Sequence, residues 1–193
     1  MSISEAEVRS IVERIVAQMV PGSAPAAPAV ASADRTVAIG ADHGGFTLKE
    51  SLREYLRNIG YQVLDVGTYS ADAVDYPDYA AAVAGKVASG AASRGIMLDG
   101  AGIGSCMVAN KIKGVRAALC YNEKTILNSR LHNNANVLTM GAPFHRPEEA
   151  EALVKLWLET EFEGGRHQKR VDKINALDKC ECQQSGCSCK TKS

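Results

Sequence analysis

This sequence of 193 residues has no net charge, because its 22 Lys and Arg are balanced by 22 Asp and Glu. The balance argues against a nucleic-acid-binding protein that works through a broad basic face. No run approaches the roughly 18 apolar residues of a transmembrane helix, and the N-terminus lacks the basic and continuous apolar regions of a secretory signal. We therefore expect a cytoplasmic protein, in which structural disulfides are rare.

Cysteine is scarce except at the C-terminus. Cys106 and Cys120 lie in the body of the chain, whereas four cysteines crowd its end with CxC-x4-CxC spacing: Cys180, Cys182, Cys187 and Cys189. Residues 179–193 therefore read as a polar, Cys-rich tail. Its four thiols could hold zinc or an iron–sulfur cluster, or they could simply be a flexible reduced tail.

The first 34 residues differ in composition from the rest of the chain. Residues 1–20 contain a capping-box pattern, Ser4 with Glu7, and then apolar residues at helical spacing, which predicts an amphipathic helix. Residues 21–34 are rich in Pro, Ala and Ser and predict an extended linker. The helix either folds back onto its own domain or serves as a targeting peptide that docks on another protein.

Residues 35–178 alternate strand and helix patterns. We expect strands at 36–41, 61–66, 95–99, 115–120 and 136–140, and helices at 47–58, 77–89, up to about 111, 123–131, 147–161 and 166–178. Apolar strands without alternation, each followed by a helix, predict a parallel sheet covered on both faces. The expected fold is an α/β, three-layer, Rossmann-like domain with a five-stranded parallel sheet in flavodoxin-like order.

Ligands of such sheets bind beyond the carboxyl ends of the strands. If the first and third strands are neighbours, Asp42, His43 and Asp99 meet there. The GAGIGS turn after Asp99 is either an anion hole for a developing enediolate or simply a tight turn. Asp99 itself is a candidate general base or the N-cap of the next helix.

Two further groups of polar residues stand out in the second half of the domain. Arg166 and Arg170 are four residues apart, which suits a phosphate clamp on one helix face or an ordinary solvated face. His132 lies in a polar run, where it could be structural, but the adjacent Asn133 and Asn134 resemble ligand-facing groups.

Five segments in order resemble a known family: GADHGGFTLKESL, VDYPDYA, GIMLDGAGIGSCMVANKIKGVRAAL, SRLHNNANVLTMGA and GGRHQKRVDKI. Together they resemble type B ribose-5-phosphate isomerase and the related galactose-6-phosphate isomerases over about residues 35–178. The resemblance implies an aldose–ketose isomerase without metal or other cofactor, acting on a phosphorylated sugar through a cis-enediolate. It also implies a homodimer or tetramer with shared active sites.

The resemblance assigns roles residue by residue. It implies that His132 opens the sugar ring and that His43, Arg166 and Arg170 contact phosphate. With the residues that face the sugar or form the anion-hole loop, the implied substrate-binding set is Asp42, His43, Tyr76, Gly100, Gly102, Gly104, Asn110, Asn133, Arg166 and Arg170. The implied catalytic residues are Asp99, His132 and Ser105.

The chain also departs from the family pattern. Many members have Cys as base where this chain has Asp99, others use Glu at the position of Ser105, and a frequent Thr is Ala101 here. Either Asp99 replaces the thiol with help from the Ser105 hydroxyl, or the site has drifted toward another sugar phosphate or toward poor activity. Cys106 is expected to face into its helix and not to act as base.

The N-terminal extension resembles the encapsulation peptides of bacterial microcompartment cargo. It implies a location inside such a compartment, with residues 1–20 docking on shell or cargo proteins. The most favoured function is isomerisation of ribose 5-phosphate to ribulose 5-phosphate. The alternatives are isomerisation of galactose or allose 6-phosphate, a sugar-phosphate-binding protein with little turnover, and, less favoured, a flavodoxin-like redox protein.

Overall fold

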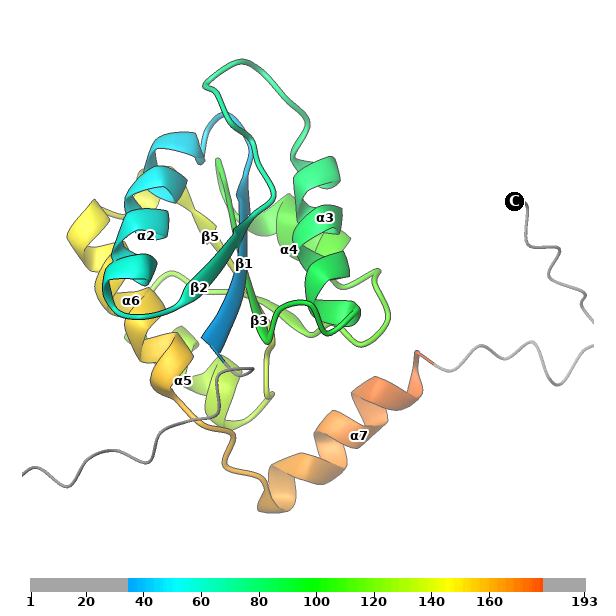
Figure 1. Cartoon of the computed structure of the whole chain (residues 1–193). Coiled ribbons are helices and arrows are strands. Elements are labelled where there is room, and N and C mark those ends of the chain that lie inside the picture. The colour runs from blue at the N-terminus through cyan, green and yellow to red at the C-terminus, as the bar shows by residue number, and fades with distance from the viewer. Residues whose placement is uncertain (1–34, 179–193) are drawn as a thin grey trace, which may run out of the picture. The chain divides into compact units, whose positions relative to one another are not determined.

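The computed structural model describes residues 35–178 and shows a five-stranded sheet covered by helices (Figure 1). The strands are β1 (Thr36–Ala41), β2 (Gln62–Asp65), β3 (Arg94–Asp99), β4 (Ala117–Leu119) and β5 (Val137–Gly141). The helices are α2 (Phe46–Asn58), α3 (Tyr76–Ala88), α4 (Ile103–Ala109), α5 (Glu123–Leu131), α6 (Pro147–Glu159) and α7 (Gln168–Ala176), with short 3-10 helices η2 (Ala142–Phe144) and η3 (Gly165–His167). The predicted targeting helix, linker and Cys-rich tail lie outside the described residues.

All strand pairs of the sheet are parallel, in the order β2-β1-β3-β5-β4. The α/β class and the parallel sheet are confirmed, but the flavodoxin-like order needs one correction, since β5 and not β4 lies beside β3. The two strands explain the exchange: every residue of β5 is buried, whereas β4 has three half-buried residues. The longer, fully buried strand takes the interior position and the short one forms the edge.

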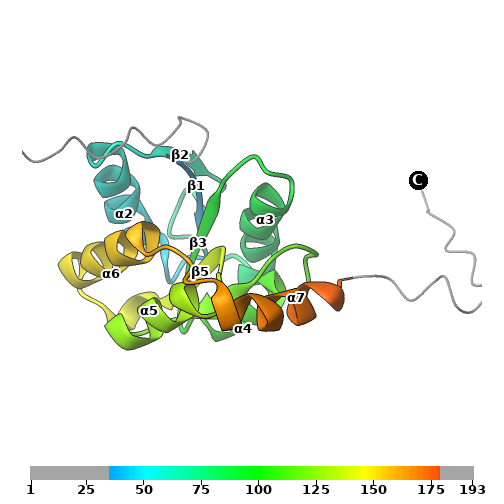
Figure 2. The ribbon, with the colours of Figure 1, turned by 90° about the horizontal axis from the view of Figure 1, so that it is seen from below.

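Helices lie on both faces of the sheet, as the view from below shows (Figure 2), and an apolar cluster fills the space between the sheet and the helices on each face. On one face, Leu52 of α2, Ile126 of α5 and Trp157 of α6 pack against β1, β3 and β5. On the other face, Val83 of α3 and Ala109 of α4 pack against the same three strands. Alternate strand residues serve the two clusters, which gives the three layers expected from the sequence.

The predicted helix 166–178 is wrong at its start. The chain passes through Gly164 (φ +68°) and Gly165 (φ +53°), then through η3, and α7 begins only at Gln168. Positive φ at two successive residues breaks a helix and favours glycine. Arg166 therefore belongs to η3, and only Arg170 lies on α7.

No helix within residues 35–178 is long and apolar enough to cross a membrane.

Candidate active site

The Asp99 carboxylate closes the turn between β3 and α4. It is 4% exposed and accepts hydrogen bonds at Oδ1 from the N–H groups of Ala101 (2.7 Å) and Gly102, and at Oδ2 from the N–H (3.3 Å) and the hydroxyl of Ser105. These four donors match the roughly four lone-pair positions of a carboxylate. Gly102, and not Asp99, is the N-cap residue of α4, but the Asp99 carboxylate caps the helix by accepting from the Ser105 N–H in its first turn. Ser105 is fully buried.

Glycines bring the loop after β1 against this turn. A Cβ on Gly44 would lie 3.3 Å from Oδ1 of Asp42 and 3.6 Å from the Gly100 nitrogen, and a Cβ on Gly45 would overlap the Leu98 carbonyl. The Asp42 N–H donates to that same carbonyl at 3.1 Å, and its side chain accepts from the Gly45 N–H at 3.0 Å. Asp42 thus lies beside the turn that follows β3, because β1 and β3 are neighbours, whereas the convergence of His43 on Asp99 stays a prediction.

The segment that joins β2 to α3 reaches the same end of the strands, where Tyr76 begins α3 and where Val74 contacts His43 of the loop after β1. The Tyr76 ring lies on Gly104, where an added Cβ would be 2.5 Å from Cζ and 2.7 Å from the hydroxyl oxygen. Nδ1 of His43 lies 3.2 Å from the Val74 carbonyl oxygen and 3.3 Å from its nitrogen. Only glycine at position 104 allows this approach.

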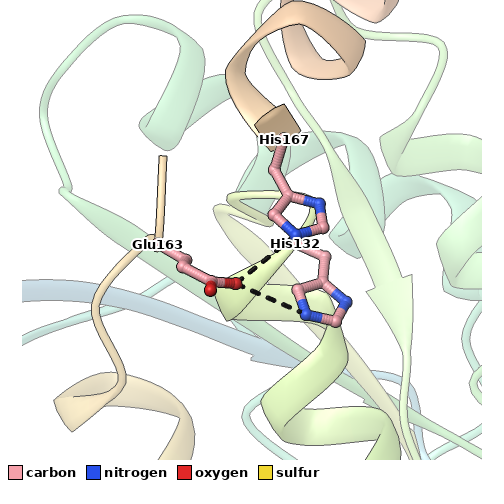
Figure 3. Close-up of side chains that lie close together, drawn as sticks. All are labelled: His132, Glu163 and His167. Atoms are coloured by element: carbon pink, nitrogen blue, oxygen red, sulfur yellow. Dashed lines mark ion pairs between the residues drawn. The ribbon is translucent and has the colours of Figure 1, made fainter. Parts of the chain in front are cut away.

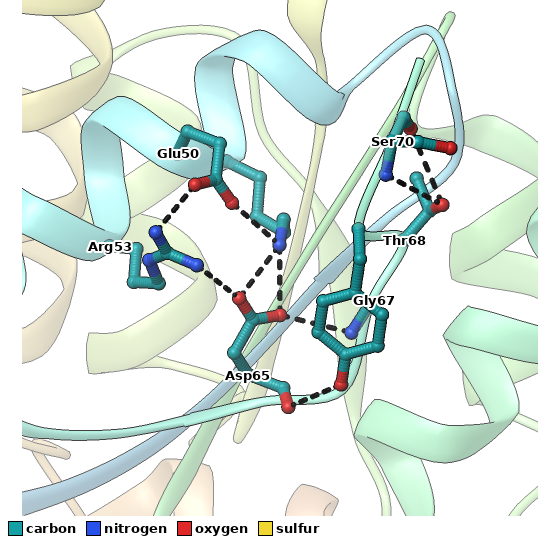
Figure 4. A network of polar contacts seen from close by, with 8 residues as sticks. Glu50, Arg53, Asp65, Gly67, Thr68 and Ser70 are labelled. Carbon is teal, nitrogen blue, oxygen red and sulfur yellow. Dashed lines mark hydrogen bonds and ion pairs between the residues drawn. The ribbon is translucent and has the colours of Figure 1, made fainter. Parts of the chain in front are cut away.

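A buried ion network holds that segment in place (Figure 4). Lys49 of α2 has a fully buried side chain whose ammonium donates to both oxygens of Asp65, at 2.9 and 2.8 Å. Asp65 also accepts from Arg53 (2.9 Å) and from the Gly67 N–H (3.0 Å). Burial alone would raise the pKa of Asp65, but the hydrogen bonds from Lys49, Gly67 and Arg53 outweigh it and lower that pKa.

A second polar cluster lies where α5 ends and η3 begins (Figure 3). The rings of His132 and His167 stack at 4.2 Å between centroids and 8° between planes. Their Nε2 atoms lie 3.6 and 3.4 Å from the same carboxylate oxygen of Glu163. Arg166 donates from Nε to Nε2 of His167 at 3.2 Å. Burial, with the nearby His132 and Arg166, lowers the pKa of His167.

The other residues that the sequence assigned to the site lie in the second polar cluster, on α7 or at the end of α4. Asn133 and Arg166 belong to the second cluster, and Arg170 is exposed on α7. Asn110 caps the end of α4, where its amide bonds the main chain of Cys106 and of Ala117, so it ties α4 to β4 away from Asp99. Sγ of Cys106 lies 3.5 Å from the Ala117 carbonyl oxygen, to which the Asn110 amide also donates.

The polar cluster around Asp99 and the polar cluster around His132 lie at opposite ends of the parallel strands. Asp99 pairs with Gly141 at the carboxyl end of β5, whereas Gly95 pairs with Val137 at its amino end, which His132 and Asn133 closely precede. Four residues of strand at about 3.3 Å each put about 13 Å between those ends. Within one chain, His132 and the phosphate residue beside it, Arg166, therefore do not meet Asp99.

Sequence reasoning missed Glu163 and His167. The signal was available in EGGRH, which places these two residues four apart, but the arginines of the same segment gave the stronger pattern. It also gave no role to Tyr121, whose hydroxyl donates to the Ala101 carbonyl at 2.6 Å. Phe144 packs edge-on against the Tyr121 ring at 5.4 Å, so an aromatic pair borders the turn after Asp99.

His132, Glu163 and His167 also have the residue types of a metal site, with ligand atoms within 4.8 Å of one another. A metal ion needs the in-plane lone pairs of both Nε2 atoms to converge on it. Nearly parallel stacked rings keep these lone pairs in separate parallel planes, and Nε2 of His167 already accepts from Arg166. The arrangement fits hydrogen bonding and does not fit a shared ion.

Comparison with known proteins places this site in a family. Residues 37–174 match the family model described as Ribose/Galactose Isomerase. The chain is 42% identical over 144 residues to the ribose-5-phosphate isomerase B of Escherichia coli, an alignment that covers 75% of this chain and 97% of that protein. It is 41% identical over 143 residues to a D-erythrulose-4-phosphate isomerase of Pectobacterium atrosepticum, covering 72% and 92%.

A solved structure agrees. The ribose-5-phosphate isomerase B of Mycoplasma genitalium, determined with bound ribulose-5-phosphate, superimposes with a TM-score of 0.71 at 44% identity, covering 74% of this chain and 95% of that one. The chain therefore belongs to the ribose/galactose isomerase family and is an aldose–ketose isomerase of sugar phosphates.

Proposed function

We propose that this protein interconverts ribose 5-phosphate and ribulose 5-phosphate through a cis-enediolate, without a cofactor. The observation that carries the proposal is the buried Asp99 carboxylate at the carboxyl edge of β3, next to a turn rich in glycine and beside Asp42 and Tyr76. The name of the Escherichia coli relative and the ligand of the Mycoplasma genitalium structure support ribose 5-phosphate as the substrate.

Asp99 is the base in this mechanism, moving a proton between C2 and C1 of the open-chain sugar. Its four hydrogen bonds leave no free acceptor position, so one donor has to leave when the base works. Three of the donors are main-chain N–H groups held by the turn, whereas the Ser105 hydroxyl turns by rotation about χ1. Ser105 therefore controls access to the Asp99 lone pair, and N–H groups of the loop stabilise the enediolate.

A second copy of the chain supplies the rest of the site, since His132 and Asp99 lie at opposite edges of one chain. Arg166 and Arg170 bind phosphate, and His132 opens the ring, in the site of the neighbouring copy. Exposed apolar side chains support this association: Ile103 and Met107 on α4, and Ile174 and Leu177 in and after α7, are 48%, 64%, 42% and 84% exposed. Ile174 follows Arg170 by four residues, so the two share one face of α7.

Two substitutions of Asp99 distinguish a role as general base from a role as helix cap. Asp99→Asn keeps the size but has no basic oxygen, and turnover of ribose 5-phosphate should fall below detection while the protein stays folded. Asp99→Cys supplies a thiolate, which can act as a base but cannot accept all four hydrogen bonds. If Asp99 is the base, Asp99→Cys keeps far more activity than Asp99→Asn. Equal loss of activity and stability in both variants would leave Asp99 only a capping role.

Mixing two inactive variants tests the shared site. Asp99→Asn and His132→Gln should each be inactive alone. In a mixed dimer one site carries both defects and the other carries none. Random pairing of equal amounts of the two chains should then restore about one quarter of wild-type activity, since half the dimers are mixed and each has one intact site. No recovery after refolding the chains together would refute the two-chain site.

The filled acceptor positions of Asp99 favour a second candidate, a protein that binds sugar phosphate with little turnover. NMR in D2O decides between the two. An isomerase incorporates solvent deuterium at C1 of the ketose and C2 of the aldose. The panel should hold ribose, galactose, allose and D-erythrulose phosphates, because a relative at 41% identity is named for the last of these. Tight binding without deuterium incorporation for any member would establish the binding protein.

We also propose that residues 1–20 target the enzyme from the cytoplasm into a bacterial microcompartment, with the 21–34 linker as spacer. The family model begins at residue 37, and the Escherichia coli relative is covered over 97% of its length by 75% of this chain, so the extension adds to the family domain. Residues 1–20 fused to a fluorescent protein should co-localise with shells, whereas diffuse fluorescence beside intact shells would refute the assignment.

A further inference from the structure

Both ring nitrogens of His132 have neighbours on the same chain. Nδ1 lies 3.0 Å from the side-chain amide nitrogen of Asn128, one helical turn earlier on α5. Nε2 lies 3.6 Å from a carboxylate oxygen of Glu163. A neutral imidazole has one N–H and one acceptor nitrogen, so these neighbours determine which nitrogen carries the proton.

Asn133 determines which way the Asn128 amide points. The Asn133 amide nitrogen lies 3.2 Å from the backbone carbonyl oxygen of Asn128 and 3.1 Å from its side-chain oxygen. A backbone carbonyl only accepts, so the Asn133 group facing it must be the NH2 donor. The Asn128 atom that meets this same NH2 is then the oxygen, and the Asn128 NH2 is left to face His132.

The hydrogen bonds therefore require one tautomer of His132. Nδ1 accepts from Asn128, which places the proton of the neutral ring on Nε2, directed at Glu163. The stacked partner has the opposite form: Nε2 of His167 accepts from Arg166, so its proton lies on the buried Nδ1. Stacking at 4.2 Å between the two rings fixes the plane of His132.

We propose that Asn128 is a positioning residue that holds His132 in the Nε2–H tautomer and so makes Nε2 the nitrogen that protonates the sugar ring oxygen. The inference rests on the proposed function, in which His132 opens the ring. The ring oxygen takes the Nε2 proton as its bond to C1 breaks, and the O1–H electrons form the aldehyde carbonyl. The O1 proton passes to water, and His132 regains a proton from water at Nε2.

Asn128 is suited to substitution because its side chain is exposed and contributes nothing to the apolar clusters. Asn128→Leu removes the donor to Nδ1. Asn128→Asp replaces it with an acceptor and should favour the Nδ1–H form. Lys124→Gln, on the first turn of the same helix, is the matched control because Lys124 precedes His132 by eight residues, or more than two helical turns.

The direct readout is long-range 1H–15N NMR of protein with 15N-labelled histidine. The chain has four histidines, and the His132 signals are those lost in His132→Gln. Wild type and Lys124→Gln should show the Nε2–H pattern at His132. Asn128→Leu should show a mixture of tautomers, and Asn128→Asp should show the Nδ1–H pattern or an imidazolium. The wild-type pattern in both Asn128 variants would overturn the proposal.

The kinetic readout uses the fact that ribulose 5-phosphate has no furanose ring to open. Asn128→Leu should lower kcat for ribose 5-phosphate about tenfold with KM nearly unchanged, and the fixed equilibrium constant then requires an equal loss of kcat/KM in the reverse direction. Exchange of solvent deuterium into C1 of ribulose 5-phosphate needs no ring opening and should change less than about twofold. A tenfold loss of this exchange as well would overturn the positioning role. Failure of the proposed function looks different: His132→Gln would then leave both directions unchanged, whereas the NMR experiment still reports the tautomer.

Discussion

Removing one partner of the Lys49–Asp65 pair tests whether that network holds the fold together. Asp65→Asn leaves the Lys49 ammonium fully buried, with Glu50, 2.9 Å away, as its remaining carboxylate. Breaking a buried pair from one side costs about 3–5 kcal/mol. Because Glu50 remains, we expect about 3 kcal/mol, which lowers Tm by roughly 6–12 °C in a domain of this size.

Urea unfolding at pH 7 measures this loss, and Glu159→Gln provides the control. Glu159 pairs with Lys155 at 3.9 Å on the surface, so its loss should cost under about 0.5 kcal/mol. The pKa of Asp65 is lowered in the folded state, so its stabilisation is present above the unfolded value of about 3.9 and disappears as pH falls through the folded one. Wild type and variant should therefore converge in acid. A loss below about 0.5 kcal/mol at pH 7 would refute the reasoning.

Three other outcomes are expected from the structure. Gly104→Ala puts a Cβ 2.5 Å from the Tyr76 ring and should therefore displace that ring. We expect kcat/KM for ribose 5-phosphate to fall about tenfold or more, while the free energy of unfolding stays within about 1 kcal/mol of wild type. Unchanged kinetics would contradict the role of Tyr76. Trp157→Phe removes a buried indole and its 3.1 Å hydrogen bond, and urea unfolding should show a loss of about 1–3 kcal/mol. Burial lowers the pKa of both His145 and His167, so the unfolded chain binds more protons below about pH 6.5 and stability should fall between pH 7 and 5. A flat profile would be inconsistent with two neutral rings, of which His167 is buried and His145 half-buried.

The carboxyl edge of the sheet was predictable because strand ends can be identified locally. Apolar runs marked β1 and β3 within a residue, and parallel neighbours bring Asp42 and Asp99 to the same edge. The glycines of the turn also indicated a close approach. The sequence did not indicate which residue packs against each glycine, such as the Tyr76 ring that lies on Gly104.

The second cluster was harder to predict because its contacts are not local. His132 and His167 are 35 positions apart, and no periodic pattern links the end of α5 to η3. The order of β4 and β5 failed for a related reason. Both strands are short and apolar, and only the comparison of their burial decides which one lies inside the sheet. The tautomer of His132 depends on three side chains together, which single-residue preferences cannot express.

The distance between the Asp99 and His132 clusters within one chain has a consequence for how the enzyme responds to dilution. A site completed by two chains exists only while the chains are associated, so activity per molecule should decline once the concentration falls below the dissociation constant of the pair. Confinement raises the effective concentration and keeps such pairs together. An enzyme of this design would gain output from crowding into a small volume even if the chemistry of each site stayed the same.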